Sequence, residues 1–529
     1  MSRILALVLF LLALTAGEAR GAEFEVVVVP GLRLTDLPRL EERGAVGLLV
    51  PGAGPRTSSD LARAALVRGE VRNSLRGGLP SGRPLVAAQT GALGSAAGAA
   101  IYLGLPAGGE QPNDRRYPIL VVGPGYRGIL TSDSTRIPGV VSVADVAPTA
   151  LGEKESLGHA ARADSASELL ELDSRIAANA DWHRAAVAVA GALVLLLALA
   201  SPPAALGGIA GSLAANLLLG LAGLSALGAV VVLALAVLLG AALVTFARPA
   251  PVRLGLALAA VVAAYLVVLA ADGPAVALSP LGPTQNGRFY GLSNVLETLL
   301  LLPALAAAAL LLARFGWPAF AGVAALAFVT VAGNRFGADG GGALVLAAGF
   351  AVLGAMLAGA GRRALAAAVA VALALVLVLV GLDAATGATS HVTRALEDGP
   401  SGLAGALRDR VALSWARATD TWYAAAGIAA LVFAGLALVA RTLTRHGAGR
   451  ASAVPLALAA ALGTSLLVND SPVDVLLVGV PAFLAADLGM IRARWPGPPS
   501  RSRWPSLWRS RSHSPAAAAA RRSRPRPRP

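Results

Sequence analysis

Hydrophobic segments follow one another from residue 184 to residue 491, separated only by short polar breaks. Hydrophobic residues make up 56% of the 529 residues, and charged residues make up 14%. So few charges could not cover the surface of a water-soluble chain of this length, whereas about 20 consecutive apolar residues suffice for one membrane-spanning helix. The pattern predicts a polytopic α-helical membrane protein, and it argues against nucleic-acid binding and soluble enzymology.

Eleven spans fit this region, with centres near residues 192, 213, 236, 261, 301, 325, 350, 373, 431, 460 and 481. The apolar stretch from 204 to 246 would be about 65 Å long as a single helix, roughly twice the thickness of the hydrocarbon layer. We therefore divide it near Gly223 to Gly228. Because the number of spans is odd, the segments before and after this region are expected on opposite sides of the membrane.

Arginines predict which side is cytoplasmic. With eleven spans, one set of turns holds Arg248, Arg253, Arg314, Arg362, Arg363, Arg441, Arg445 and Arg450, as the positive-inside rule requires. Residues 492–529 add eleven arginines and no acidic residue. We expect this tail to be disordered and cytoplasmic, and to contact the anionic inner leaflet. The alternative is a tail that only sets the topology.

The N-terminal third has an ordinary composition and predicts an exported domain. Residues 1–22 show the basic start, apolar run and small residues of a signal peptide, with an uncleaved first membrane helix as the alternative. Between residues 23 and 152, strands such as FEVVVV and YPILVV alternate with helical patterns, which favours an extracytoplasmic α/β domain with a mainly parallel sheet. Residues 153–183 predict a polar juxtamembrane helix.

Three stretches on the predicted outward side carry polar residues that hydropathy does not explain. They read GPTQNGRFYGLSNVLETLL before the fifth span, AGNRFGADGGGAL after the sixth and LLVNDSPVDVLL after the tenth. Charges at membrane depth are costly unless they are paired or face water, so these residues are functional candidates. The candidate catalytic acids are Glu297, Asp339 and Asp470, and the candidate phosphate ligands are Asn286, Arg288, Tyr290, Asn294, Asn334, Arg335 and Asn469.

Glu297 is the sharpest of these candidates. We expect it about two helical turns inside the fifth span, on the same face as Asn294 three residues earlier. The alternative for the whole cluster is a set of structural ion pairs and helix caps at the membrane interface. The glycines at 340–342 would admit an anion to a helix start, although close helix packing is the favoured interpretation.

The longest outward loop, from 383 to 420, contains GLAGALRDRVALSWARATDTW. Apolar residues can line one side of a helix there, while Arg408, Arg410 and Arg417 take the other, which predicts a helix lying in the membrane interface. Arg408 and Arg410 are further candidate phosphate ligands, because a guanidinium group grips phosphate with two donors. The chain has no cysteine, and its five histidines are scattered, so we expect no metal site and no cofactor.

The exported domain resembles the alkaline phosphatase and sulfatase superfamily. The resemblance lies in VVVVPG, in PRTSS and in the segment TSDSTRIPGVVSVADVAPTAL, whose closing DVAPTAL is its most specific part. It implies the fold but a degenerate, inactive site, because Pro30 stands where active members have a metal-binding Asp and the usual His ligands are missing. Thr57 and Ser58 lie where the nucleophile would be. The whole arrangement resembles uncharacterised bacterial multi-span membrane proteins that bear RFYG, GAD and NDS motifs.

A second resemblance covers residues 330–420, where an arginine precedes a glycine-rich span and a long outward loop carries R-D-R-x-x-L-x-W. This order is similar to that of O-antigen ligases and polymerases. It implies that Arg335, Arg408 and Arg410 hold the diphosphate of a polyprenyl-linked glycan.

Three functional hypotheses follow. The first is binding or processing of a lipid-linked anionic glycan at the outer face of the bacterial plasma membrane, through a metal-independent glycosyltransferase or ligase-like activity if a reaction occurs. The second is a proton- or cation-coupled transporter or flippase, for which Asp487 is the one deep acid on the inner side. The third is a non-catalytic scaffold with a pseudo-phosphatase domain. Membrane lipids or a lipid-linked glycan are the expected partners, with envelope proteins as further candidates and no nucleic acid.

Overall fold

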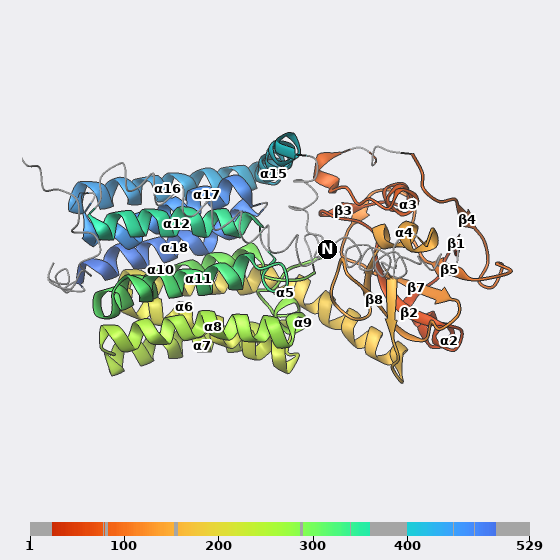
Figure 1. The fold of residues 1–529 in the computed structure, drawn as a ribbon, viewed down its shortest axis with the longest axis horizontal. Coiled ribbons are helices and arrows are strands. Elements are labelled where there is room, and N and C mark those ends of the chain that lie inside the picture. Colours follow the sequence, from red (N-terminus) through yellow and green to blue (C-terminus); the bar gives the residue numbers. More distant parts are fainter. Residues whose placement is uncertain are drawn as a thin grey trace, which may run out of the picture.

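The protein has two parts, an α/β domain and a bundle of long helices (Figure 1). The computed structural model describes residues 24–77, 79, 83–152, 157–285, 289–338, 340–359, 399–447, 449–469 and 471–492. The α/β domain covers one end of the bundle, and we call residues 24–160 the cap. The covered end of the bundle is the cap end, and the opposite end is the far end.

The cap is built on one mixed sheet of eight strands, with β9 beside β2 and the other strands in the order β10-β8-β2-β7-β5-β1-β4. Its strands are β1 (Glu25–Val28), β2 (Ala45–Val50), β4 (Ala88–Thr90), β5 (Ala100–Leu103), β7 (Tyr117–Val122), β8 (Gly128–Ser132), β9 (Val140–Ser142) and β10 (Leu157–Ala160).

The sheet is mixed, so the expectation of a mainly parallel sheet is confirmed only in part. Four of its strand pairings are parallel, whereas β7 runs antiparallel to both β2 and β5, and β10 runs antiparallel to β8. A parallel neighbour needs a long crossover, usually a helix. The connection from β5 to β7 contains only the two-residue strand β6 (Gln111–Pro112) and no helix. The chain therefore returns to the sheet in the opposite direction.

Helices cover both faces of the sheet, which explains why its strands are apolar throughout. One face packs against α2 (Leu37–Glu41) and the first part of α5 (Ser165–Ala200). The other face packs against α3 (Ser59–Arg68) and α4 (Val146–Ala150). Successive side chains of β1 enter the two cores in turn, as the period of a strand requires.

Helix α5 joins the two parts of the molecule. It has 36 residues, so it is about 54 Å long and can lie on the sheet and then continue into the bundle. The polar helix predicted at 153–183 therefore begins later than expected and does not end at the bundle. The segment before it supplies β10 instead, because LGHA pairs with the open edge of β8.

The bundle contains helices at ten of the eleven predicted span centres. After α5 they are α6 (Pro202–Ala222), α7 (Ala226–Ala247), α8 (Pro251–Ala271), α10 (Asn294–Phe315), α11 (Trp317–Ala332), α12 (Gly340–Ala358), α16 (Trp422–His446), α17 (Ala453–Val468) and α18 (Pro472–Arg492). Within the described ranges, eight helices are long and apolar enough to cross a membrane. The predicted span near 373, the predicted signal peptide and the tail beyond Arg492 lie outside those ranges.

The apolar stretch from 204 to 246 forms two helices, which are separated at residues 223–225, within the region predicted from its length. Helix α6 ends at Ala222, and Gly223 takes the left-handed conformation at φ +71°, which glycine adopts without strain. Helices α6 and α7 then pack backbone to backbone. An added Cβ at Gly207 would lie 2.3 Å from the Gly240 carbonyl oxygen, which shows how closely the two helices approach.

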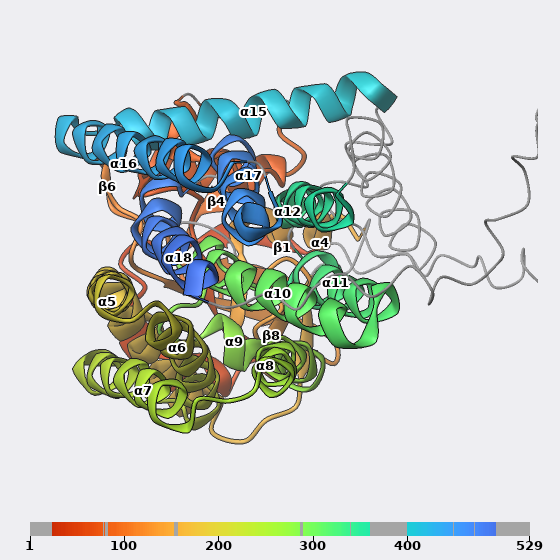
Figure 2. The ribbon, with the colours of Figure 1, turned by 90° about the vertical axis from the view of Figure 1, so that its left-hand side faces the viewer.

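Helix α10 lies in the middle of the bundle (Figure 2). In its apolar window 89% of the residues are buried, whereas in that of α16 none are. The helices alternate in direction. Six arginines near helix ends therefore lie at the far end: Arg248, Arg253, Arg314, Arg441, Arg445 and Arg450, whereas Arg335 lies in a turn at the cap end. The described chain reaches the far end at Gly359 and resumes at the cap end with α15 (Gly399–Thr419).

The close approach of α6 and α7 is testable with one methyl group. Gly240→Ala would place a Cβ 2.2 Å from the Gly207 carbonyl oxygen, so we expect the free energy of unfolding in detergent micelles to fall by about 1–3 kcal/mol. Gly228→Ala on the same helix is the matched control, because nothing lies within 4 Å of its Cβ. Equal stability of the two variants would contradict this packing.

Candidate functional site

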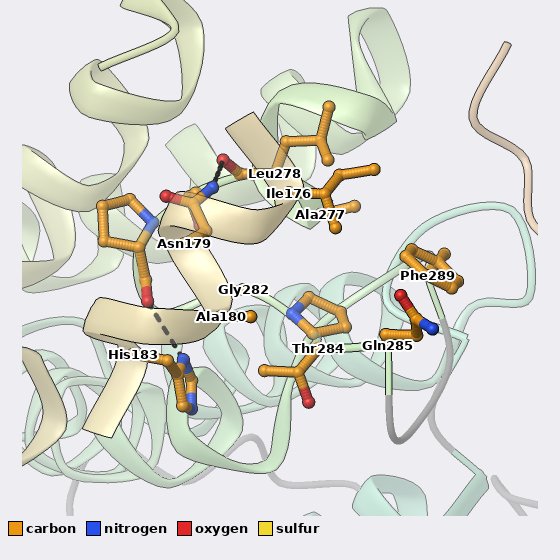
Figure 3. Close-up of a pocket in the computed structure, with 13 residues that line it drawn as sticks. Ile176, Asn179, Ala180, His183, Ala277, Leu278, Gly282, Thr284, Gln285 and Phe289 are labelled. Carbon is orange, nitrogen blue, oxygen red and sulfur yellow. Dashed lines mark hydrogen bonds between the residues drawn. The ribbon is translucent and has the colours of Figure 1, made fainter. Parts of the chain in front are cut away.

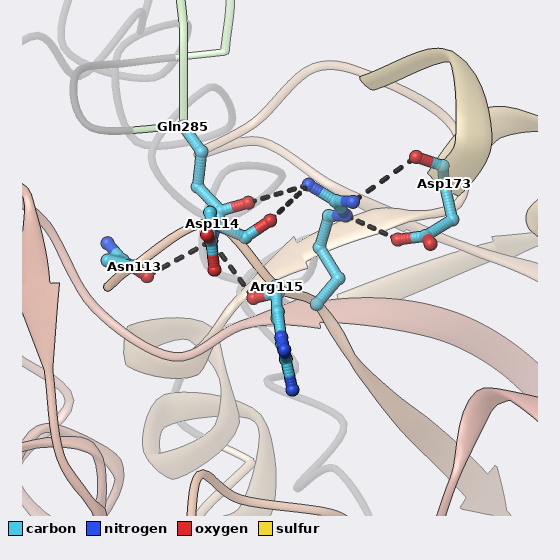
Figure 4. A network of polar contacts seen from close by, with 6 residues as sticks. Asn113, Asp114, Arg115, Asp173 and Gln285 are labelled. Carbon is cyan, nitrogen blue, oxygen red and sulfur yellow. Dashed lines mark hydrogen bonds and ion pairs between the residues drawn. The ribbon is translucent and has the colours of Figure 1, made fainter. Parts of the chain in front are cut away.

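The cap is fixed to the bundle by a buried arginine. Arg116, just before β7, is 5% exposed, and its guanidinium group donates to the Asp173 carboxylate on α5 and, at 2.9 Å, to Oε1 of Gln285 (Figure 4). Gln285 belongs to the loop before α10, and its amide donates to Oδ1 of Asn113 at 3.0 Å. One guanidinium group thus links the cap, α5 and a bundle loop.

Apolar packing continues across the same junction. Ile176 of α5, Leu278 after α9 (Gly273–Ala277) and Phe289 belong to the core that underlies the cap sheet. A cavity of about 20 Å³ lies here between α5 and the 277–289 loop, and Asn179, His183 and Thr284 are among its lining residues (Figure 3). This volume holds one or two water molecules but no larger ligand.

A second arginine of the cap reaches the predicted polar stretches. Arg136, between β8 and β9, donates to the backbone carbonyl oxygen of Asn334 and, at 3.3 Å, to its Oδ1. Its guanidinium carbon also lies 4.2 Å from the centroid of the Tyr290 ring, which is a cation–π distance. Tyr290 and Asn334 come from the first two predicted stretches, so the fold brings these two candidates together.

The backbones of those two stretches are in contact as well. The Leu292 amide donates to the Gly337 carbonyl oxygen at 3.1 Å. Gly291, at φ +75°, comes so close to this carbonyl oxygen that an added Cβ would lie 2.0 Å from it. Here glycine is required both for the backbone conformation and for the close approach.

Glu297 and Asn469 form a buried polar pair at the cap end. Glu297 is 0% exposed and accepts a hydrogen bond from Nδ2 of Asn469 at 2.9 Å, and the same nitrogen donates to Oγ of Ser465 at 2.8 Å. The predicted depth of Glu297 is wrong, because α10 begins at Asn294 and Glu297 lies in its first turn. Its hydrogen-bond partner Asn469 directly follows α17, so Glu297 is buried against another part of the bundle although it lies close to the start of α10.

Helix α15 lies across the cap ends of the bundle helices (Figure 2). Ser414 donates to the Leu466 carbonyl oxygen at 3.1 Å, Arg410 to the Val468 carbonyl oxygen at 3.5 Å and Arg417 to Oγ of Ser471 at 3.2 Å. Two guanidinium groups therefore lie on the turn that carries Asn469.

The exposed side of α15 is tied to the cap. Asp409 is 2.6 Å from a guanidinium nitrogen of Arg76, and this hydrogen bond lowers the pKa of the Asp409 carboxyl group. Arg408 beside it is exposed. Some of the charged side chains of the predicted interfacial helix thus form contacts with the cap and with the 468–471 turn.

The candidates predicted from sequence have different outcomes. Tyr290 and Asn334 meet at Arg136, Glu297 pairs with Asn469, and Arg410 lies beside that pair. Arg335 and Arg408 are exposed, and Asn294 is the first residue of α10. Four candidates lie outside the described residues: Asn286, Arg288, Asp339 and Asp470.

Of the two residues that the phosphatase resemblance places at the nucleophile position, Ser58 has a structural contact. Thr57 is buried, and Ser58 caps α3 by accepting a hydrogen bond from the Leu61 amide at 3.2 Å. Asp145 of the DVAPTAL segment accepts from Ser132 and Ser134, and burial raises the pKa of its carboxyl group. In the described part of the chain, no group of three or more His, Cys, Asp or Glu residues could hold a metal ion.

Asp487, the deep acid on the far side, also has partners. Its carboxylate is 2.6 Å from a guanidinium nitrogen of Arg441 and accepts a hydrogen bond from Thr442 at 2.6 Å. Both partners lie on α16, so this pair fastens α16 to α18. The arrangement is that of a structural ion pair within the bundle.

Sequence reasoning missed Arg116, Gln285 and Arg136. Arg116 precedes an apolar strand and resembled a solvated strand end, and Gln285 is an amide in a turn. Arg136 lies inside the TSDSTR segment that carries the phosphatase resemblance, so its position was noticed but its contact with the bundle was not. The available signal was an arginine in a polar loop, which is common in a chain this rich in arginine.

The Glu297–Asn469 pair yields a stability prediction. Asn469→Ala removes a donor from a fully buried carboxylate, so we expect the free energy of unfolding to fall by about 1–3 kcal/mol. Thr464→Ala on the same helix is the control, because the Thr464 hydroxyl donates only to Ala460 within α17. Thermal unfolding in detergent compares the two, and equal midpoints would contradict the assigned pair.

Comparison of the chain with protein-family models, with curated proteins and with solved structures finds no match in any of the three. The resemblances drawn from short motifs therefore stay predictions. What the protein does has to be inferred from the junction between cap and bundle.

Proposed function

We propose that the protein is an envelope membrane protein that binds the phosphate or diphosphate of a lipid-linked glycan at the cap end of its helix bundle. One observation carries this proposal: α15 lays Arg410 and Arg417 on the 468–471 turn, beside the buried Glu297–Asn469 pair. Guanidinium groups bind phosphate oxygens with two donors, and they bind more strongly where protein excludes water.

The distribution of arginines supports an outward-facing site. Most arginines of the described turns between bundle helices lie at the far end, with Arg335 at the cap end as the exception, and the positive-inside rule assigns the far end to the cytoplasm. The cap end would then face the periplasm or cell exterior, so the proposed ligand would be bound from the outer leaflet. A substrate carried by the bilayer also fits α15, which lies across the bundle axis as interfacial helices do.

We propose binding of this ligand and no glycosyl transfer. Glu297 is 0% exposed and bonded to Asn469, so it can orient the turn but has no open path to a sugar hydroxyl. A glycosyl transfer would need an accessible carboxylate as base. The other two candidate acids, Asp339 and Asp470, lie outside the described residues.

A scaffold role is the second candidate, and the cap favours it. The cap residues that reach the bundle are used for attachment, and Ser58 is used to cap a helix. A cap of this kind would present a docking surface without chemistry. Transport is less favoured, because the deep acid Asp487 is already paired with Arg441.

Substitution of the α15 arginines tests the binding proposal. We expect Arg410→Ala and Arg417→Ala each to weaken binding of polyprenyl phosphate about tenfold or more, because each removes a charged donor. The purified full chain in phosphatidylcholine nanodiscs is titrated with polyprenyl phosphate. Arg314→Ala at the far end of α10 is the matched control.

Unchanged affinity in both α15 variants would overturn the proposal. Absence of binding by the wild-type protein would do so as well, and would leave the scaffold role as the better account.

A further inference from the structure

Arg136 takes an unfavourable backbone conformation to reach the bundle. Its φ is +55°, in the left-handed region that residues with a Cβ seldom adopt. Such strain persists only where surrounding contacts hold it in place, and it often marks functional positions.

Asp145 holds the loop from the cap side. Its carboxylate accepts hydrogen bonds from the hydroxyls of Ser132 and Ser134, and from the backbone amide of Ser142 at 3.0 Å. These donors lie on both sides of Arg136, so one buried carboxylate fixes the ends of the 132–142 turn. Arg136 is thereby presented to the bundle from a rigid base.

On the bundle side, Arg136 contacts two different loops. Its forked donors reach both oxygens of Asn334, while its flat face covers the Tyr290 ring. A lysine could not do both, because its ammonium group is a compact point charge without a planar fork. The residue therefore acts as a clamp between the 289–293 loop and the 333–338 loop.

We propose that Arg136 is a positioning residue. The 289–293 loop leads directly into the first turn of α10, where Glu297 accepts a hydrogen bond from Asn469. By holding this loop and the 333–338 loop, the cap would keep the Glu297–Asn469 pair and the neighbouring 468–471 turn in the arrangement that receives the substrate phosphate. This inference rests on the proposed function for its ligand, but the clamp itself does not. The cap then contributes to the membrane site without any chemistry of its own. Tyr290 and Asn334, both predicted as phosphate ligands, would be ordered by a residue that lies about 150 positions or more away in sequence.

Hydrogen exchange and ligand binding test the clamp separately. In the full chain in nanodiscs, we expect Arg136→Ala to speed amide exchange in both the 289–293 and 333–338 loops. We expect it also to weaken polyprenyl phosphate binding about tenfold, because the two loops would then adopt the binding-competent arrangement about one tenth as often. Arg136→Lys should lie between wild type and alanine in both measurements.

Arg127→Ala is the matched control, because this cap arginine contacts only cap carbonyl oxygens, at Arg43 and Tyr126. It should leave exchange in both loops and the affinity at wild-type values. The thermal unfolding midpoint of every variant is measured as well. A variant with a general loss of folding is recognised by a lower midpoint and by faster amide exchange in the cap strands.

Each outcome decides one point. Unchanged exchange in the two loops of Arg136→Ala would overturn the clamp. Faster exchange with unchanged affinity would overturn its role in the site. Faster exchange in a protein whose wild type binds no polyprenyl phosphate would keep the clamp and overturn the proposed function.

Discussion

The attachment of the cap to the helix bundle depends on the buried guanidinium group of Arg116. A charge with 5% exposure is tolerable only if it is paired and its donors are satisfied, and here Asp173 and Gln285 do this from two different segments. Removal of Asp173 would leave an uncompensated buried charge, and removal of Gln285 would take away one of the hydrogen-bond acceptors of that charge. The pairing therefore favours a single orientation of the cap, and the contacts of Arg136 and Arg76 with the bundle and α15 follow from that orientation.

The cap and the helix bundle contribute different features to the proposed site. The bundle supplies the polar pair Glu297–Asn469 in its interior, and α15 adds two arginines at the edge. The cap supplies rigidity from a sheet whose two faces are both buried. On the proposed function, the cap would serve the membrane site without chemistry of its own, by holding the loops that carry the site.

Much of the architecture could be predicted from hydropathy and length. The separation of α6 from α7 follows from the thickness of the membrane, and the position of α5 follows from its apolar second half. The direction of β7 could not be predicted, because apolar strands look alike whether they run parallel or antiparallel. The depth of Glu297 could not be predicted either, since hydropathy does not show where a loop ends and a helix begins.

The site was predictable in residue type but not in pairing. Polar residues in three separated stretches indicated an unusual region, and the structure brings Tyr290 to Asn334 and Glu297 to Asn469. What brings the first pair together is Arg136, a cap residue that no local pattern connects to the bundle. Contacts between segments far apart in sequence depend on the tertiary fold, which a single sequence does not show.

The proposed site needs the cap to be seated over the cap end, and the contact between Arg76 of the cap and Asp409 of α15 reports this seating from the surface. Because the chain has no cysteine, the double variant Arg76→Cys/Asp409→Cys carries only the thiols of interest, and it leaves the Arg116 network intact. We expect a short bifunctional thiol reagent to cross-link this pair efficiently in native membranes, with the two single variants as controls. If the pair stays uncross-linked although both thiols react with a monofunctional reagent, the cap is not seated as described and the account is wrong.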